Sequence, residues 1–214
     1  MQLIRIGMKT KLILMLLVWG VSVASAQNTE SDNTPKTLIN GTGDLELSAF
    51  VGAEASATSL ADETALLTGF NAGLLINNRL SLGGFYAFSV NEVVPNQNLP
   101  LDTYLDLRMG GGMVEYRFFP NSLIHLSLPL LIGGGEVQLD RSGDYDELDP
   151  SFGEKNFFLV EPGLLGELNI TKAIKFQLGV SYRALMMDGD YFGFNQTDFS
   201  GLNGKAGIRI HLFN

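Results

Sequence analysis

The chain has 214 residues, 23 of them acidic and 14 basic, so its formal net charge at pH 7 is −9. This acidic balance disfavours nucleic acid as a partner, because a basic patch would be needed to bind it. The absence of cysteine excludes disulfide bonds, thiolate metal sites, a cysteine nucleophile and a lipid-modified cysteine.

The N-terminus has the pattern of a secretory signal peptide over 1–26. Three basic residues precede a short apolar run, which closes on the small residues Ala24-Ser25-Ala26. Cleavage is expected before Gln27, and it leaves 11 basic and 23 acidic residues, a formal charge of −12. An uncleaved anchor is the alternative, but polar residues follow the apolar run at once. The polar segment 27–43 is expected to be a flexible periplasmic lead.

From 44 to 214 the chain alternates apolar residues with polar or small ones. In the first stretch, Leu45, Leu47 and Ala49 alternate with Glu46 and Ser48, which is the period of a β-strand. No helical period persists in this part of the chain. We expect eight strands, over 45–55, 65–76, 80–90, 104–118, 123–138, 156–170, 173–185 and 200–214.

The connections between these stretches alternate in length. Long ones are expected at 56–64, 91–103, 139–155 and 186–199, and short ones at 77–79, 119–122 and 171–172. Short periplasmic turns and long extracellular loops are typical of outer-membrane barrels. The sequence therefore predicts an eight-stranded antiparallel up-and-down transmembrane β-barrel over 44–214, located in the bacterial outer membrane.

Charged residues interrupt the polar faces of the expected strands. If the apolar faces meet lipid, these charges lie inside the barrel, where they must pair to offset the cost of desolvation. An eight-stranded barrel is just wide enough for side chains to fill, so we expect a plugged polar interior and no pore. The six acidic and six basic members of this network are Glu46, Glu54, Asp106, Glu115, Glu161 and Glu167 with Arg108, Arg117, Lys175, Arg183, Lys205 and Arg209.

The fourth strand places its charges on two different faces. Asp106 and Arg108 occupy even positions, whereas Glu115 and Arg117 occupy odd ones. Glycine permits a β-bulge, and Gly110-Gly111-Gly112 lies between the two pairs. We therefore expect a bulge there that turns all four charges inward.

Two segments at the short turns, Glu115-Tyr-Arg-Phe-Phe-Pro-Asn-Ser-Leu-Ile-His125 and Val160-Glu-Pro-Gly-Leu-Leu-Gly-Glu-Leu-Asn-Ile-Thr-Lys172, add to this layout. The whole resembles the small eight-stranded outer-membrane barrels typified by OmpX and the OmpA barrel domain. The resemblance covers most of the chain after the signal peptide. It implies outer-membrane lipid and lipopolysaccharide as surroundings, the barrel-assembly machinery as a partner during insertion, and no cofactor.

One arrangement of residues is similar to a catalytic one. His125 and Ser127, with Glu136 further along, resemble the histidine, serine and glutamate of PagL-type lipid A deacylases, in which the carboxylate orients the imidazole that takes the serine proton. The nine steps from Ser127 to Glu136 span roughly 30 Å of strand, which is too far for a triad. We expect no catalysis, with His125 and Ser127 filling the interior.

The third long connection is strongly acidic. Asp144, Asp146, Glu147 and Asp149 are weak candidates for a calcium site, since hard cations take carboxylate oxygens. Their spacing does not reproduce a known calcium loop, and an acidic run is more often a solvated surface. Looser cation bridging to lipopolysaccharide phosphates is a related hypothesis.

The favoured function is that of a non-enzymatic envelope protein. Its extracellular connections 139–155 and 186–199 would serve an envelope-structural or surface-recognition role, because loops on rigid scaffolds carry function. The alternatives are a lipid A-modifying barrel enzyme and a soluble periplasmic barrel that binds an apolar ligand with its apolar faces turned inward. The ligand on the extracellular side is not predicted.

Overall fold

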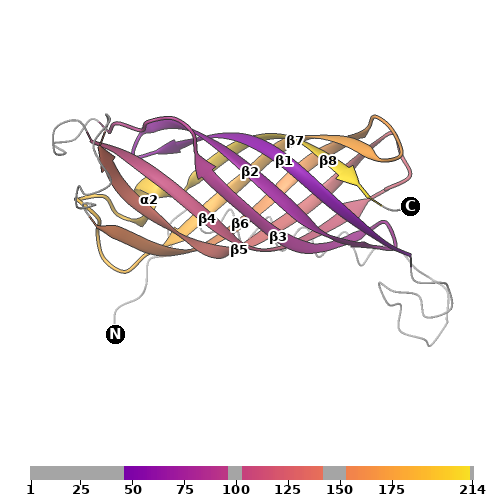
Figure 1. Cartoon of the computed structure of the whole chain (residues 1–214), viewed down its shortest axis with the longest axis horizontal. Coiled ribbons are helices and arrows are strands. Elements are labelled where there is room, and N and C mark those ends of the chain that lie inside the picture. The colour runs from indigo at the N-terminus through magenta and orange to yellow at the C-terminus, as the bar shows by residue number, and fades with distance from the viewer. Residues whose placement is uncertain (1–45, 96–102, 142–152, 213–214) are drawn as a thin grey trace, which may run out of the picture. The chain divides into compact units, whose positions relative to one another are not determined.

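The computed structural model describes residues 46–95, 103–141 and 153–212. They form a closed barrel in which each strand pairs antiparallel with its neighbours in the chain and β8 closes on β1 (Figure 1). The expected eight-stranded up-and-down barrel is confirmed. The strands are β1 Leu47–Leu60, β2 Glu63–Ile76, β3 Leu80–Ser89, β4 Thr103–Phe118, β5 Ile124–Arg141, β6 Glu154–Asn169, β7 Ile174–Met186 and β8 Gly201–His211.

A short helix, α2 (Gln196–Phe199), precedes β8. Asn195 caps it: its side chain accepts a hydrogen bond from the Thr197 N–H at 2.8 Å, while its own N–H donates to Asp198 at 2.7 Å. Four residues are too few to show a helical period, so α2 could not be predicted from the sequence. Among the residues described here, no helix is long and apolar enough to cross a membrane.

The first connection is a tight turn and not the long loop expected over 56–64. Only Ala61 and Asp62 separate β1 from β2, and both have a positive φ, 50° and 66°. This is the backbone that joins two strands through two residues. The error arose because the end of β1 consists of alanine, serine and threonine, which give too little contrast between the two faces.

The bulge expected at Gly110-Gly111-Gly112 is wrong. β4 pairs with β5 without interruption from Thr103 to Phe118, and its pairing with β3 is equally regular. Gly111 instead stands opposite Gly133 on β5, and a Cβ on either residue would collide with the backbone of the other strand. These glycines allow close approach of the strands, and they do not shift their register.

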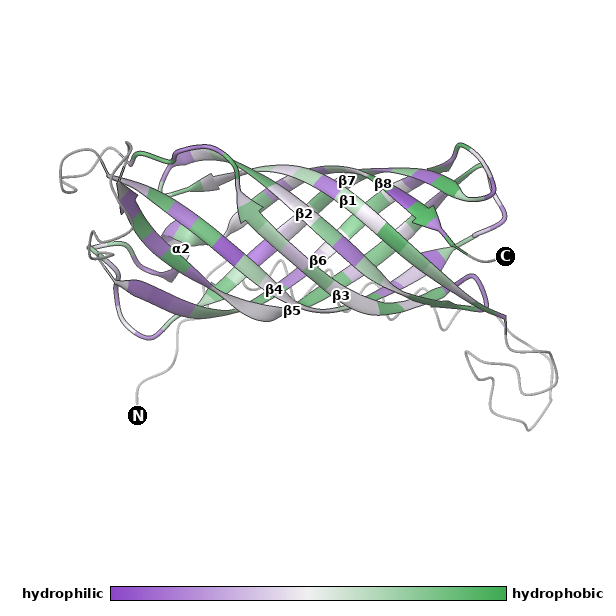
Figure 2. Ribbon diagram, viewed as in Figure 1, coloured by the Kyte–Doolittle hydropathy of each residue, from purple (hydrophilic) through white to green (hydrophobic). Residues whose placement is uncertain are grey.

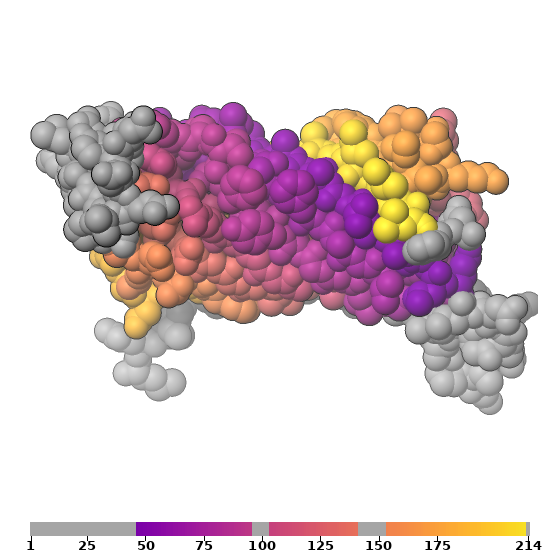
Figure 3. All heavy atoms as spheres, viewed as in Figure 1, coloured from indigo at the N-terminus to yellow at the C-terminus, as the bar shows by residue number. Residues whose placement is uncertain are grey.

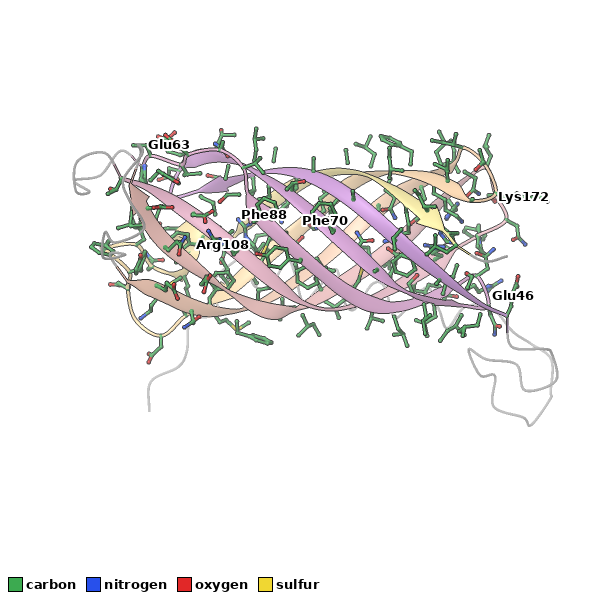
Figure 4. All side chains as sticks on the ribbon, in the orientation of Figure 1. Glu46, Glu63, Phe70, Phe88, Arg108 and Lys172 are labelled. Carbon is green, nitrogen blue, oxygen red and sulfur yellow. The ribbon has the colours of Figure 1, made fainter. Side chains whose placement is uncertain are left out.

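The outer face of the barrel is apolar along most of its length. Figure 2 shows hydrophobic positions recurring along the strands, and Phe70, 55% exposed, lies on this face (Figure 4). The alternative of a soluble barrel with its apolar faces inward is contradicted by this orientation. Other exposed members of the face are Leu66, Leu74, Leu82, Tyr86, Val114, Leu126, Leu128, Ile132, Leu164, Leu178, Val180, Leu202, Ile208 and Ile210.

The apolar outer face ends before the strands do. On β4 it runs from Phe118 to the level of Arg108, and ten residues of a tilted strand span about 25 Å, the height of an outer-membrane barrel's apolar band. Beyond Arg108, polar residues such as Asp106, Gln138 and Asp140 face outward. The space-filling view shows a wall closed by atoms on the viewed face (Figure 3).

Candidate functional site: the filled interior

The interior of the barrel has two halves of different character. The half nearest the loop end is an apolar core, which contradicts the expectation of a polar interior throughout. Its buried members are Leu60, Ala61, Ala65, Leu67, Ala87, Val93, Leu105, Leu107, Met109, Val137, Leu139, Phe157, Leu159, Leu185, Tyr191, Phe194 and Phe199. The half nearest the short turns holds the buried charges.

Glu115 on β4 is a centre of this charged half. Both nitrogens at the tip of Arg209 donate to it, one of them to Oε2 at 3.1 Å. Arg117 Nε donates to its Oε1 at 3.2 Å, and Ser81 Oγ lies 3.3 Å from the same oxygen. The guanidinium of Arg209 also lies 4.5 Å from the centre of the Phe50 ring. Two arginines from separate strands thus neutralise one buried carboxylate.

Glu167 on β6 is the second centre. His125 Nε2 lies 2.7 Å from its Oε2, and Gln177 Nε2 donates to its Oε1 at 2.6 Å. Arg117 and Arg209 lie within 3.4 Å and 3.6 Å of its carboxylate oxygens. The two arginines therefore join the two glutamates into one buried network.

A smaller cluster lies further from the short turns. Lys205 on β8 pairs with Glu161 at 2.6 Å and with Glu54 at 3.1 Å. Ser181 Oγ donates to Glu161 at 2.7 Å and accepts from Asn203 Nδ2 at 3.2 Å. One lysine thus bridges carboxylates from β1 and β6.

Arg183 links the charged half to the fourth connection. Its Nε donates to the Phe199 carbonyl at 3.1 Å, and one terminal nitrogen donates to Thr58 Oγ1 at 3.3 Å. Among the described residues Arg183 has no ion pair, so a backbone carbonyl at the end of α2 replaces the carboxylate expected from the sequence.

Three residues expected in the interior lie elsewhere. Glu46 is exposed at the end that carries the short turns (Figure 4). Asp106 and Arg108 stay on the outer face because no bulge turns β4, and they form an ion pair there at 3.0 Å with the Arg108 side chain 46% exposed. Their placement near the loop end of the apolar face explains how charges are tolerated on it.

Glu136 does not join His125 and Ser127, as the distance along the strand predicted. His125 and Ser127 face the interior and are buried, whereas Glu136 stands beside Arg108 in the pairing of β4 and β5, on the opposite face. His125 is paired with Glu167 instead. Ser127 Oγ is buried and makes no hydrogen bond with the described residues.

The candidate calcium ligands Asp144, Asp146, Glu147 and Asp149 lie outside the described residues. Within the described part of the chain, no three histidine, aspartate or glutamate side chains gather as a metal site would require.

The fourth connection packs into the loop end of the barrel, which sequence reasoning missed. Phe194 and Phe199 are buried in the apolar core with their ring centres 5.9 Å apart. The Tyr191 hydroxyl accepts from the Leu139 N–H at 2.9 Å and donates to the Gly153 carbonyl at 2.6 Å, and burial raises the pKa of this phenol. The several aromatic residues in this connection could have indicated its packing, because large apolar side chains are unfavourable in a loop that is surrounded by water.

Three solved structures are similar to this barrel. Neisserial surface protein A is 18% identical, with a TM-score of 0.52, over 77% of this chain and 96% of that protein. The attachment invasion locus protein Ail of Yersinia pestis is 13% identical over 78% and 97% of the two chains, with a TM-score of 0.43. A major outer membrane protein of Thermus thermophilus is 12% identical over 77% and 99%, with a TM-score of 0.48.

The likeness to Neisserial surface protein A shows a shared fold, and at this identity it shows no more than that. No protein-family model matches the chain. No curated protein matches it either. The chain therefore has the fold expected from the resemblance, a small eight-stranded barrel of the outer-membrane type.

Proposed function

We propose that the protein is an outer-membrane barrel without enzymatic activity, whose loop end has an envelope-structural or surface-recognition role. The observation that carries the proposal is the polarity of the wall. Large apolar side chains face outward over about 25 Å of strand height, while paired charges fill the interior beside them. In water the outer apolar side chains would be exposed to solvent while charges stayed buried. In lipid the same apolar side chains contact acyl chains, and the charges remain paired inside.

The absence of catalysis is supported by the burial of the candidate groups. His125 and Ser127 have 2% and 0% of their surface exposed, so a substrate has no access to either. A catalytic histidine must come within hydrogen-bond reach of the proton it moves. The His125–Glu167 pair is instead one more contact in the buried network.

The surface role is supported by the loop end of the barrel. Here the wall carries acidic side chains outward, among them Asp106, Glu136 and Asp140. With the acidic connection 139–155, they suit contact with lipopolysaccharide through divalent cations, or with an extracellular partner. Outer-membrane lipid on the barrel wall and the barrel-assembly machinery during insertion are the other partners in this proposal, and export depends on the signal peptide ending before Gln27.

Single cysteines provide the test, because the natural chain has none. Phe70→Cys and Asp106→Cys are expressed in intact cells and treated with a membrane-impermeant maleimide. We expect labelling at position 106 and none at 70, which becomes reactive only after the membrane is dissolved and the barrel is unfolded. Equal labelling of both sites in a soluble periplasmic fraction would refute the membrane location.

The enzymatic alternative is tested separately. Lipid A is compared by mass spectrometry in cells expressing the wild type, His125→Ala and no barrel at all. We expect three identical lipid A profiles. A change of mass that requires an intact His125 would show catalysis and overturn the proposal.

A further inference from the structure

A polar depression lies at the short-turn end of the barrel and belongs to none of the clusters described above. Its volume is about 270 Å³, and it is lined by Lys172, Lys175 and His211 with Thr171, Asn78 and neighbouring turn residues. Turns of three hairpins and the last strand contribute to it. The depression is large enough for a small anion with part of its hydration shell.

Lys175 is the residue that distinguishes this depression. Only 5% of the residue is exposed, and no ion pair or hydrogen bond joins its ammonium to the described residues, so the group faces the depression that it lines. Glu167 and Glu115 interact with this ammonium electrostatically, but neither pairs with it directly. Every other lysine or arginine in the charged half is bound to a carboxylate or a carbonyl. Lys175 is therefore the cation of this half that has no direct counter-ion among the described residues.

Neighbouring groups can donate hydrogen bonds to the same space. His211 Nε2 lies 3.4 Å from a terminal nitrogen of Arg117, which can only donate, so Nε2 accepts and the imidazole proton lies on Nδ1. Thr171 Oγ1 accepts from two backbone N–H groups, of Ala173 and Ile174, which leaves its own proton to donate. Lys172, Lys175, His211 and Thr171 thus supply donors to the lining of the depression.

The local charge is opposite to that of the whole chain. The interior layer next to the depression holds Arg117, Lys175 and Arg209 against Glu115 and Glu167. Both carboxylates are already bound by arginine, which leaves one positive charge in excess, with Lys172 adding a second. An anion would balance a cationic spot on a protein whose formal charge is −9.

We propose that this depression is a binding site for a phosphate group. Donors on the β6–β7 turn, on β7 and on β8 surround one space, which suits the three or more acceptor oxygens of a phosphate better than the two of a carboxylate. The phosphate belongs either to a phospholipid headgroup or to a soluble molecule. The headgroup source rests on the proposed membrane location, since exposed Ile170 and Ile174 flank the same turn and would lie in lipid.

The first experiment measures phosphate binding without any lipid. Inorganic phosphate is titrated into the mature chain in a maltoside detergent by calorimetry at pH 7, with acetate as the competing anion. We expect phosphate to bind and acetate to bind far more weakly. We further expect Lys175→Gln to weaken phosphate binding by about tenfold or more, the effect of one charge-assisted hydrogen bond.

Two further variants control this result. Lys172→Gln changes an exposed residue of a turn, where we expect folding to be retained, and it should also weaken binding. Arg79→Gln removes an exposed charge of the β2–β3 turn that does not line the depression, and it should leave binding unchanged. Absence of phosphate binding in the wild type, equal affinity for acetate, or equal weakening in all three variants would each overturn the site.

A second experiment identifies the source of the phosphate. The wild type and Lys175→Gln are extracted from membranes with maltoside and examined by native mass spectrometry. A phospholipid retained by the wild type and lost from the variant assigns the site to a headgroup. Equal lipid retention together with specific binding of inorganic phosphate assigns it to a soluble ligand. Because the titration requires no membrane, it stands even if the proposed membrane location fails.

Discussion

Single buried carboxylates decide how the charged half of the barrel holds together. Glu115 receives hydrogen bonds from Arg209, Arg117 and Ser81. Both arginines are almost fully buried, so neither can turn to water if the carboxylate is lost. A buried ion pair adds little net stability, but removing one partner leaves the other charge uncompensated.

Glu115→Gln is therefore expected to lower the free energy of unfolding by about 3–5 kcal/mol. Reversible urea unfolding in lipid vesicles, followed by far-UV circular dichroism, measures this free energy. The control is Asp106→Asn, which weakens an ion pair at the outer face whose arginine is 46% exposed, and it should cost about 1 kcal/mol. Similar losses in both variants would contradict the burial argument.

Tyr191, which lies outside the membrane-spanning part, is expected to make the stability of the fold depend on pH. Its hydroxyl donates to the Gly153 carbonyl, which only the protonated phenol can do, and burial raises its pKa above the ordinary 10.0. A group whose pKa is raised by folding stabilises the fold below its unfolded pKa and loses this effect as the pH rises through its folded pKa.

Tyr191→Phe tests whether the stabilisation by Tyr191 decreases as the pH rises. Below about pH 10 the wild type should exceed the variant in stability by about 1 kcal/mol, the contribution of a hydrogen bond. Above that pH the difference should shrink, as measured by urea unfolding at a series of pH values. A difference that grows with pH would show that the phenolate is the favoured form.

At the scale of elements, the strands could be predicted and their end regions could not. Alternation such as that of Leu202 to Ile210 is a property of the sequence alone, so the number of strands followed from it. The lengths of the connections indicated their order and direction. The Ala61-Asp62 turn was missed because its flanking residues lack apolar contrast. The position of Phe199 was missed because it depends on distant residues: its carbonyl accepts from Arg183, and its side chain belongs to the apolar core at the loop end.

The interior charges could likewise be predicted only in part. Parity alone places Asp106 and Arg108 on the outer face, and only the assumption of a bulge moved them inward. Which acid pairs with which base could not be predicted, because the pairing depends on how strands tilt around the barrel. Arg209 reaches Glu115 across the interior, and their strands are not neighbours.

The close contact of β4 and β5 gives a test of the glycine pair. Gly111→Ala should lower the free energy of unfolding by about 1–3 kcal/mol, since its Cβ would meet the backbone at Ile132 and Gly133. Gly204→Ala is the matched control, because a Cβ there has nothing within 4 Å. If a true bulge existed at 110–112, Gly111→Ala would instead be tolerated as well as the control.

For the barrel as a whole, polarity changes along the axis on both faces. Outside, apolar residues give way to Asp106, Gln138 and Asp140 toward the loop end. Inside, charges give way to the apolar core that Leu105, Leu107 and Phe199 help to form. The loop end therefore has a polar outside and an apolar inside, as in a soluble barrel, whereas the remainder has the reverse arrangement of a membrane barrel. We expect β4 and β5 to extend beyond the lipid at the loop end.

This two-part interior predicts that the barrel does not conduct ions, even after its charged half is opened. The wild type and the double variant Glu115→Gly and Arg209→Gly are reconstituted in planar bilayers. Removing both side chains takes away a buried ion pair of the charged half, but the apolar core at the loop end still blocks the path, because ions do not cross a packed apolar core. We expect no stable conductance steps from either protein, with a wide porin as the positive control. Steps from the double variant would place the barrier at the ion pair, and steps from the wild type would show that the interior is not filled.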